Sequence, residues 1–324
     1  MKSINLGKLK IDTPIFLCPL AGITDYPYRY MVGKFHANLM YSEMLSSLAL
    51  THNSKHSLKM LDIANEVANN NVGIQIAGSN LQAMKDAAKM AEDKGACLLD
   101  INMGCPAKKV VNGIAGSALM KDEVLAGKIM ETVVNAVKIP VSVKMRLGWD
   151  LNSINAPTLA KIAENSGISL ITVHGRTRNQ FYSGESNYLE IAKVKNNVNI
   201  PVIANGDIKN EEDMLCALKE SKADGIMVGR GTYGKPWLIK QLTHFVTTGN
   251  KLKEPSRSEK LEIVLQHYDL ILSYYGKEIG KKVARKHLSW YTKGLPNSAE
   301  ARAKINVLED VSLVRDSVKS CFYG

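Results

Sequence analysis

The chain of 324 residues is 45% hydrophobic and 23% charged, which is the composition of an ordinary soluble protein. It contains no run of about 18 apolar residues that would predict a membrane span, and its N-terminal residues lack the apolar segment of a signal peptide. We therefore expect a cytoplasmic protein. The five cysteines are scattered and form no CxxC pair, so the sequence predicts neither a metal site nor a disulfide framework.

The formal net charge is +11 at pH 7. An excess of this size is typical of proteins that bind a polyanion such as a nucleic acid. It is also found in basic proteins that bind none, and charge alone leaves both interpretations open.

The first 240 or so residues repeat a short apolar run, a polar or glycine-rich turn and a stretch with helical spacing. Most of the runs are continuous rather than alternating, as in strands that are buried on both faces of a parallel sheet. The apolar runs cover residues 15–19, 39–44, 72–77, 97–103, 139–145, 170–174, 200–204 and 223–228. The clearest helical patterns between them cover residues 81–94, 122–137, 156–165 and 211–219.

Eight strand–helix units in about 240 residues predict a TIM barrel, an α/β fold of about 250 residues. The alternative is a doubly wound sheet, which would carry a Gly-x-Gly-x-x-Gly turn after its first strand. The sequence has no such turn at that point. We therefore expect a barrel over residues 1–250.

The residue pattern changes at about residue 251, where strand-like apolar runs disappear and helix-forming residues dominate. Residues 251–324 therefore predict a small all-α domain. They hold 14 basic and nine acidic residues, so positive charge is denser here than in the barrel. Lys282, Arg285 and Lys286 lie at helical spacing and form the candidate surface for a polyanion.

Barrel active sites lie at the carboxyl ends of the strands, and phosphate groups are usually bound after strands seven and eight. Here those loops read Asn205-Gly206-Asp207 and Gly229-Arg230-Gly231. Glycine lets backbone N–H groups approach an anion, and arginine pairs with phosphate through two hydrogen bonds. We expect a phosphate-bearing cofactor or substrate at these turns.

The other strand ends are polar. Gln75, Asn102, Lys144 and His174 each lie at or near the end of an expected strand. Such groups at a buried barrel mouth are unfavourable unless they bind something, and this set suits a planar heterocycle with carbonyl and imide edges.

Cys105 follows the fourth strand, between Gly104 and Pro106 and close to two lysines. A thiol in a basic neighbourhood can act as a nucleophile or a general acid. Its position alone does not distinguish these roles from that of a structural cysteine. Lys144 could also form a Schiff base with a carbonyl substrate, which is the main enzymatic alternative.

Six motifs stand in order along the chain: PLAGITD at 19–25, NMGCP at 102–106, VKMR at 143–146, HGRTR at 174–178, NGD at 205–207 and GRG at 229–231. Together they resemble the tRNA-dihydrouridine synthase family, over nearly the whole chain. The segment ARKHLSWY at 284–291 is similar to the bacterial B-type branch of that family. Leu20 departs from the pattern, because the family usually has methionine there.

The resemblance implies an FMN-dependent oxidoreductase that reduces a specific uridine in tRNA to 5,6-dihydrouridine, with NADPH as the electron donor. It implies that the barrel carries FMN and that the helical domain binds tRNA. Cys105 would then donate a proton, and Asn102 and Arg178 would contact the target uracil. The residues implied to bind FMN are Pro19, Leu20 and Ala21 at the ring wall, Gln75 and Lys144 at the ring edge, and His174, Asn205, Gly206, Asp207, Gly229 and Arg230 on the phosphate side.

Two other functions stay open from the sequence. The first is an FMN barrel that acts on a free pyrimidine such as dihydroorotate, although a small substrate needs no basic domain. The second is a tRNA-binding protein without catalytic activity, although Cys105 and the complete set of flavin residues argue against it.

Overall fold

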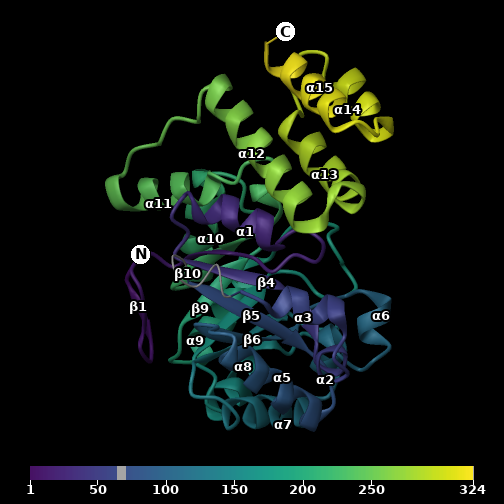
Figure 1. Cartoon of the computed structure of the whole chain (residues 1–324). Helices are drawn as coiled ribbons and strands as arrows, with labels where there is room; N and C mark the ends of the chain where they lie inside the picture. The colour runs from purple at the N-terminus through teal and green to yellow at the C-terminus, as the bar shows by residue number, and fades with distance from the viewer. Residues whose placement is uncertain (64–70, 324) are drawn as a thin grey trace.

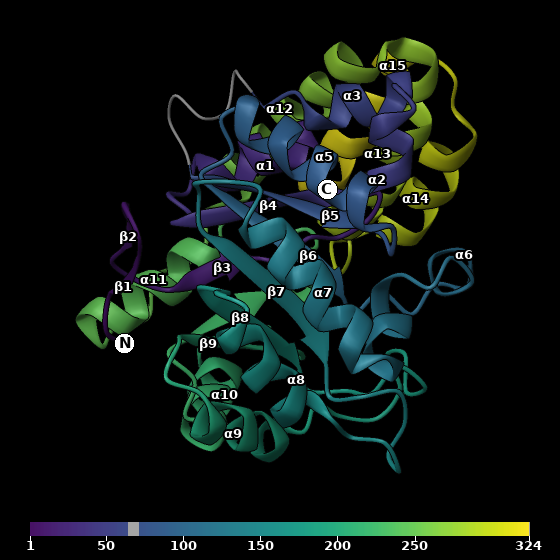
Figure 2. The same ribbon diagram turned by 90° about the horizontal axis from the view of Figure 1, so that it is seen from below.

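The computed structural model describes residues 1–63 and 71–323. Eight parallel strands close into a barrel, with helices around its outside (Figures 1 and 2). The strands are β3 (Ile15–Leu17), β4 (Leu39–Ser46), β5 (Val72–Ala77), β6 (Leu98–Met103), β7 (Val141–Arg146), β8 (Leu170–His174), β9 (Val202–Asn205) and β10 (Gly225–Val228). Neighbouring strands follow chain order, and β10 pairs with β3 to close the ring. The expected TIM barrel is confirmed, and each of the eight apolar runs overlaps one strand.

Burial on both faces explains why these strands are continuous apolar runs. Every residue of β5, β6 and β7 is buried, one face against the barrel interior and the other against the surrounding helices. Polar residues interrupt the runs near the carboxyl ends, at Gln75, Asn102 and Lys144. Those positions lie together because parallel strands end at the same mouth of the barrel.

The four helices expected from the sequence are present as α5 (Leu81–Asp93), α7 (Glu123–Val134), α8 (Ala156–Asn165) and α10 (Glu211–Ser221). Several of the shorter helices have no clear apolar period and were not predicted. The helical segments of the barrel are α1 (Tyr26–Gly33), α2 (Ser47–Thr51), α3 (Lys55–Leu61), α5 (Leu81–Asp93), α6 (Lys108–Val111), the 3₁₀ turn η1 (Gly116–Lys121), α7 (Glu123–Val134), α8 (Ala156–Asn165), α9 (Tyr188–Asn197), α10 (Glu211–Ser221), the 3₁₀ turn η2 (Arg230–Thr232) and α11 (Leu238–Thr248). None of the helices in the described residues has the length and hydropathy of a membrane-spanning segment.

A hairpin of β1 (Ile4–Leu6) and β2 (Leu9–Ile11) precedes the barrel. Its apolar side chains share one core cluster with residues on several barrel strands, among them Phe16, Leu98 and Leu170. The hairpin therefore covers apolar side chains at the amino ends of the strands, opposite the mouth that carries the polar groups.

Four helices follow the barrel and lie over α1 in Figure 1: α12 (Arg257–Tyr275), α13 (Lys277–Tyr291), α14 (Ser298–Val307) and α15 (Val311–Tyr323). A capping box of Ser256 and Glu259 begins α12, since each side chain bonds the other residue's backbone N–H. The four helices enclose a core of their own, which includes Val264, Leu288 and Val318.

Two buried histidines lie where α12 and α13 pack against α1. The rings of His267 and His287 are 4.7 Å apart, and Tyr28 of α1 lies 5.6 Å and 5.5 Å from them. His267 shares a hydrogen bond of 3.1 Å with the Tyr291 hydroxyl. Burial lowers the pKa of His267 to about 3, and burial lowers the pKa of His287 well below 6.5, with smaller contributions from the neighbouring His267 and Lys286. Both rings are therefore neutral in the folded protein at pH 7.

We expect His287→Leu to become more stable relative to the parent as the pH falls below about 6.5. In that range the unfolded parent binds a proton on His287 that the folded parent cannot, so the parent loses about 1.4 kcal/mol of unfolding free energy per pH unit. Urea unfolding of both proteins between pH 7.5 and 5 measures this difference. Asp25 and Asp100 have raised pKa values and titrate with the opposite sign, but they are present in both proteins and cancel. A difference that does not change with pH would contradict the expectation.

Candidate active site

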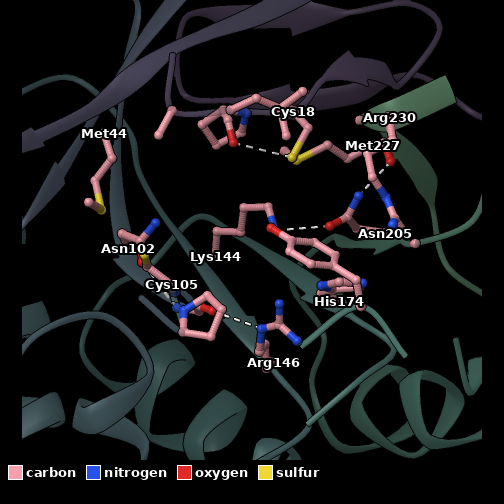
Figure 3. Close-up of a pocket in the computed structure, with 18 of the residues that line it drawn as sticks. Cys18, Met44, Asn102, Cys105, Lys144, Arg146, His174, Asn205, Met227 and Arg230 are labelled. Carbon is pink, nitrogen blue, oxygen red and sulfur yellow. Dashed lines mark hydrogen bonds between the residues drawn. The ribbon is translucent and has the colours of Figure 1, made fainter. Parts of the chain in front are cut away.

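A cavity opens at the carboxyl ends of the barrel strands, where the polar groups meet (Figure 3). In Figure 3, Asn102 and Cys105 lie on one side of it, and Asn205, Met227 and Arg230 lie on the other. Residues at or near the carboxyl end of each of the eight barrel strands line it, and Tyr182 joins them from the loop after β8. It therefore has the position that barrel enzymes use for catalysis.

A directed chain of hydrogen bonds runs from the barrel interior to Cys105. The Gln75 amide donates to the buried Asp100 carboxyl at 2.6 Å, and its carbonyl accepts from the Asn102 amide at 2.8 Å. The Asn102 carbonyl in turn accepts from the backbone N–H of Cys105 at 2.9 Å. Burial raises the pKa of Asp100 to about 6, although hydrogen bonds from Gln75 and Ser142 oppose the shift. The chain fixes which edge of each amide faces the cavity.

The loop that carries Cys105 is held from its other side by η1. The Cys105 carbonyl accepts from the backbone N–H of Ser117 at 3.1 Å and from its hydroxyl at 2.9 Å. Gly116 makes this approach possible: its φ is +61°, and a Cβ there would lie 2.8 Å from the same carbonyl oxygen. Cys105 is half-buried at the cavity wall, so its thiol is fixed in place and still reachable.

Lys144 places a buried cation at the centre of the lining. Its ammonium donates to the Asn205 side-chain oxygen at 2.9 Å, and the Asn205 amide donates to the Met227 carbonyl at 2.8 Å. The second bond orients the Asn205 oxygen toward the lysine. The site thus presents a fixed positive charge to any planar ligand that enters.

Asp207 organises the end of the cavity at β9 and β10. Its carboxylate accepts two hydrogen bonds from the buried Arg176, at 3.0 Å and 2.6 Å, and one of 3.2 Å from Arg230. Partial burial raises the pKa of Asp207, but the bonds from Arg176 and Ser186 outweigh it and hold that pKa below its ordinary value. The Asp207 side chain therefore positions cations and does not itself offer a group to a phosphate.

His174 is neutral beside this cluster. Burial lowers its pKa well below 6.5, and the nearby charges of Lys144, Arg146, Arg176 and Arg230 lower it further. The cationic end of the cavity is thus made by the lysine and the arginines. An anion is the ligand that such an end favours.

A comparison with known families decides the identity. Residues 16–322 match the family model described as Dihydrouridine synthase (Dus). The chain belongs to this family. It is 52% identical over 315 residues to a probable tRNA-dihydrouridine synthase of Rickettsia conorii, with 97% of this chain and 95% of the relative covered. It is 42% identical over 325 residues to tRNA-dihydrouridine synthase B of Xanthomonas axonopodis pv. citri, with 99% and 97% covered, which confirms the resemblance to the B-type branch.

Solved structures support the fold alone. A histamine dehydrogenase from Rhizobium sp. 4-9 matches with a TM-score of 0.61 at 12% identity, over 83% of this chain and 50% of that one. A morphinone reductase variant matches with a TM-score of 0.56 at 13% identity, over 80% of this chain and 93% of that one.

Most of the residues that the sequence indicated for this family member line the one cavity. Arg178 does not: its guanidinium lies over Trp149 and Phe181, at 4.5 Å and 5.2 Å from their ring centroids, beyond the lining. The indicated residues that line the cavity are Pro19, Leu20, Ala21, Gln75, Asn102, Cys105, Lys144, His174, Asn205, Gly206, Asp207, Gly229 and Arg230. Their roles toward a ligand stay predictions.

Sequence reasoning missed several members of the lining. Cys18, Met44 and Met227 carry no polar signal and look like core residues in a strand. Tyr182 lies in the long loop after β8 and places its ring 5.7 Å from the Arg146 guanidinium and 4.7 Å from that of Arg230. Nothing in the local pattern separated it from its neighbours in that loop.

The basic residues of α13 differ in their surroundings. Lys282 is exposed, and within the part of the chain that the structure describes it forms no ion pair. Arg285 pairs with Glu309 at 3.3 Å. Lys286 donates to the carbonyl of Gly22, in the barrel. Helical spacing alone predicted that these three residues form one free basic face. In the structure only Lys282 is free of such a contact among the described residues, so they do not form that face.

Proposed function

We propose that this chain is a flavin-dependent tRNA-dihydrouridine synthase that uses FMN and NADPH to reduce a specific uridine in tRNA. The observation that carries the proposal is the cavity itself. Cys105 stands on one side, Asn205 and Arg230 stand on the other, and Lys144 lies between them. Family membership supports the substrate class, since the names of both relatives refer to tRNA and dihydrouridine. A cytoplasmic location, where tRNA is found, is part of the proposal.

The donor set fits FMN. Gln75 and Lys144 offer hydrogen bonds deep in the cavity, where a flavin ring edge carries carbonyl and imide groups. Arg230 and the glycine turns beside it offer one anion site, which suits the single phosphate of a mononucleotide. Leu20 in place of the usual methionine keeps a similar volume at the wall. When bound, FMN would supply the hydride that reduces the uracil ring at C6.

Hydride addition at C6 leaves negative charge on C5 and O4 of the base, so C5 must gain a proton. The Cys105 thiol is the donor we assign to that step, from a loop fixed by Asn102 and Ser117. Lys144 stabilises negative charge near the centre of the cavity. A uridine within folded tRNA must be turned out of its stack to reach this depth.

The helical domain supplies the remaining tRNA contacts in this proposal. Lys282 is the residue of α13 best placed to meet a phosphate, because its ammonium is exposed and unpaired among the described residues. Arg285 is half-buried and already paired, so it would contribute less. Asn102 lines the cavity and is the proposed uracil contact there, whereas Arg178 would reach the RNA from beyond the rim.

Reconstitution tests the proposal. The purified protein, with FMN and NADPH, should form dihydrouridine at a defined position in tRNA that lacks the modification. Oxidation or formation of free dihydroorotate instead would favour the small-pyrimidine enzyme. Tight tRNA binding without any flavin binding would favour the non-catalytic alternative. Either result would overturn the proposal.

We expect the purified protein to be yellow and to release FMN rather than FAD on denaturation. The cavity offers one anion site, and the sequence holds no adenosine-binding motif. Chromatography of the released chromophore identifies it. Release of FAD, or no flavin after incubation with FMN, would contradict the cofactor assignment.

A further inference from the structure

Two side chains of α13 reach onto the barrel from the same side of the helix. Lys286 and Trp290 are four residues apart, about one turn, and therefore lie one above the other. Lys286 donates to the carbonyl of Gly22, and Trp290 stacks on Tyr233 with ring centroids 4.0 Å apart and planes 12° apart. Gly22 directly follows Ala21, and Tyr233 lies two residues after Gly231. Both Ala21 and Gly231 line the cavity.

The Lys286 contact holds the loop after β3. Gly22 follows Ala21, which lines the cavity, and has a φ of +73°. Its backbone N–H donates to the Glu43 carboxylate in β4, while its carbonyl accepts from Lys286. The two bonds fix the orientation of this residue between the barrel and the helical domain.

A second helix supports the same loop. Asp25 caps α1 by accepting from the backbone N–H of Tyr28 at 3.0 Å, and it also accepts from the Tyr275 hydroxyl of α12 at 2.8 Å. The segment after the cavity wall is therefore tied to the helical domain at two points.

The Trp290 contact holds the loop after β10. Tyr233 directly follows η2, and its backbone N–H donates to the Arg230 carbonyl at 3.2 Å. The next residue, Gly234, packs so closely that a Cβ there would lie 2.6 Å from the Trp290 carbonyl oxygen. The ring that stacks on Trp290 therefore belongs to a residue three positions after Arg230, the arginine assigned to the anion site, and its backbone is hydrogen-bonded to that arginine.

We propose that Lys286 and Trp290 are positioning residues that brace the two cofactor loops of the barrel, so that the helical domain contributes to FMN affinity as well as to tRNA binding. This inference rests on the proposed function. Lys282, one turn before Lys286 on the same helix, points to solvent and takes the other role. In this proposal Lys286 supports FMN binding by bracing a loop of the barrel, whereas Lys282 contacts tRNA.

Matched variants of the full-length protein separate the roles. We expect Lys286→Met and Trp290→Leu to weaken FMN binding roughly 5- to 10-fold, the lower range of coupling between linked sites. Lys286→Arg, which keeps a cationic donor, should recover most of the affinity. Lys282→Met should leave FMN binding unchanged and weaken tRNA binding, with a salt dependence lower by about one counterion. Flavin fluorescence measures the first affinity, and filter binding at several salt concentrations measures the second.

The outcomes are distinct. If Lys286→Met binds FMN as the parent does and instead loses tRNA affinity and salt dependence, Lys286 is a phosphate contact and the inference is wrong. If Lys286→Met does not fold, Trp290→Phe and Trp290→Leu decide, because phenylalanine keeps an aromatic stack and should retain FMN where leucine does not; equal FMN affinity in these two would also overturn the inference. A parent protein that binds no FMN would overturn the proposed function, and this inference with it.

Discussion

Cys105→Ala should lower the rate of dihydrouridine formation by about 10²- to 10⁴-fold, the usual contribution of a positioned proton donor. Flavin binding and flavin reduction by NADPH should stay close to those of the parent. The two half-reactions should separate because, in the proposed mechanism, the thiol acts on the base, and it stands across the cavity from Asn205 and Arg230. Alanine leaves the backbone bonds to Asn102 and Ser117 in place, so the loop keeps its position.

Single-turnover assays with reduced protein and tRNA measure the loss, and stopped-flow absorbance with NADPH alone measures the flavin half-reaction. Cys216→Ala is the matched control, since Cys216 is exposed on α10 and does not line the cavity. Its turnover should equal the parent's. Turnover by Cys105→Ala within a few-fold of the parent would remove this thiol from the mechanism.

The barrel was predictable because strands buried on both faces leave a continuous apolar run, and eight such runs are present. The candidate site was predictable where polar residues interrupt those runs near their carboxyl ends, as Gln75 and Lys144 do. Such groups stand out because burial of a polar side chain is unfavourable unless it is bonded. The fold and the candidate site could thus be predicted from the same physical rule, that buried positions are apolar unless a buried polar group is bonded.

The same rule explains what the sequence could not reveal. Strands of three residues, like those of the β1–β2 hairpin, are too short to show a period. Cys18 and Met227 line the cavity but are apolar, so nothing distinguishes them from core residues. Asp100 is polar, yet its partners Gln75 and Ser142 lie on other strands, and only the barrel brings them together.

The lysines of α13 show most clearly what helical spacing in a sequence can and cannot predict. Helical spacing correctly placed Lys282 and Lys286 on one side of a helix, because the period is a local property. It could not show that Gly22, 264 residues earlier in the chain, accepts a hydrogen bond from one of them. Which lysine is free for a partner depends on how the two parts of the molecule pack.

Asp207→Asn should reduce the free energy of unfolding by about 3 kcal/mol, the lower end of the loss expected when one partner of a buried ion pair is removed. The Arg176 side chain is 2% exposed, so its guanidinium would stay buried without the carboxylate that now accepts two of its hydrogen bonds. Asparagine has the same size and tolerates the φ of +53° at this position, so backbone strain does not contribute. Urea unfolding at pH 7 measures the difference.

The pH dependence identifies the cause of that loss. The pKa of Asp207 is held below its ordinary value of 3.8, so its ion pair stabilises the parent above that pH and is lost as the pH falls through the lowered pKa. The gap between parent and variant should therefore be constant from pH 7 to about 5 and shrink below about 4. Glu212→Gln is the control: it removes an ion pair with Lys251 whose side chains are 63% and 59% exposed, and such pairs contribute about 1 kcal/mol or less. A loss in Asp207→Asn no larger than that of the control would mean that the carbonyls around Arg176 suffice to hold its charge.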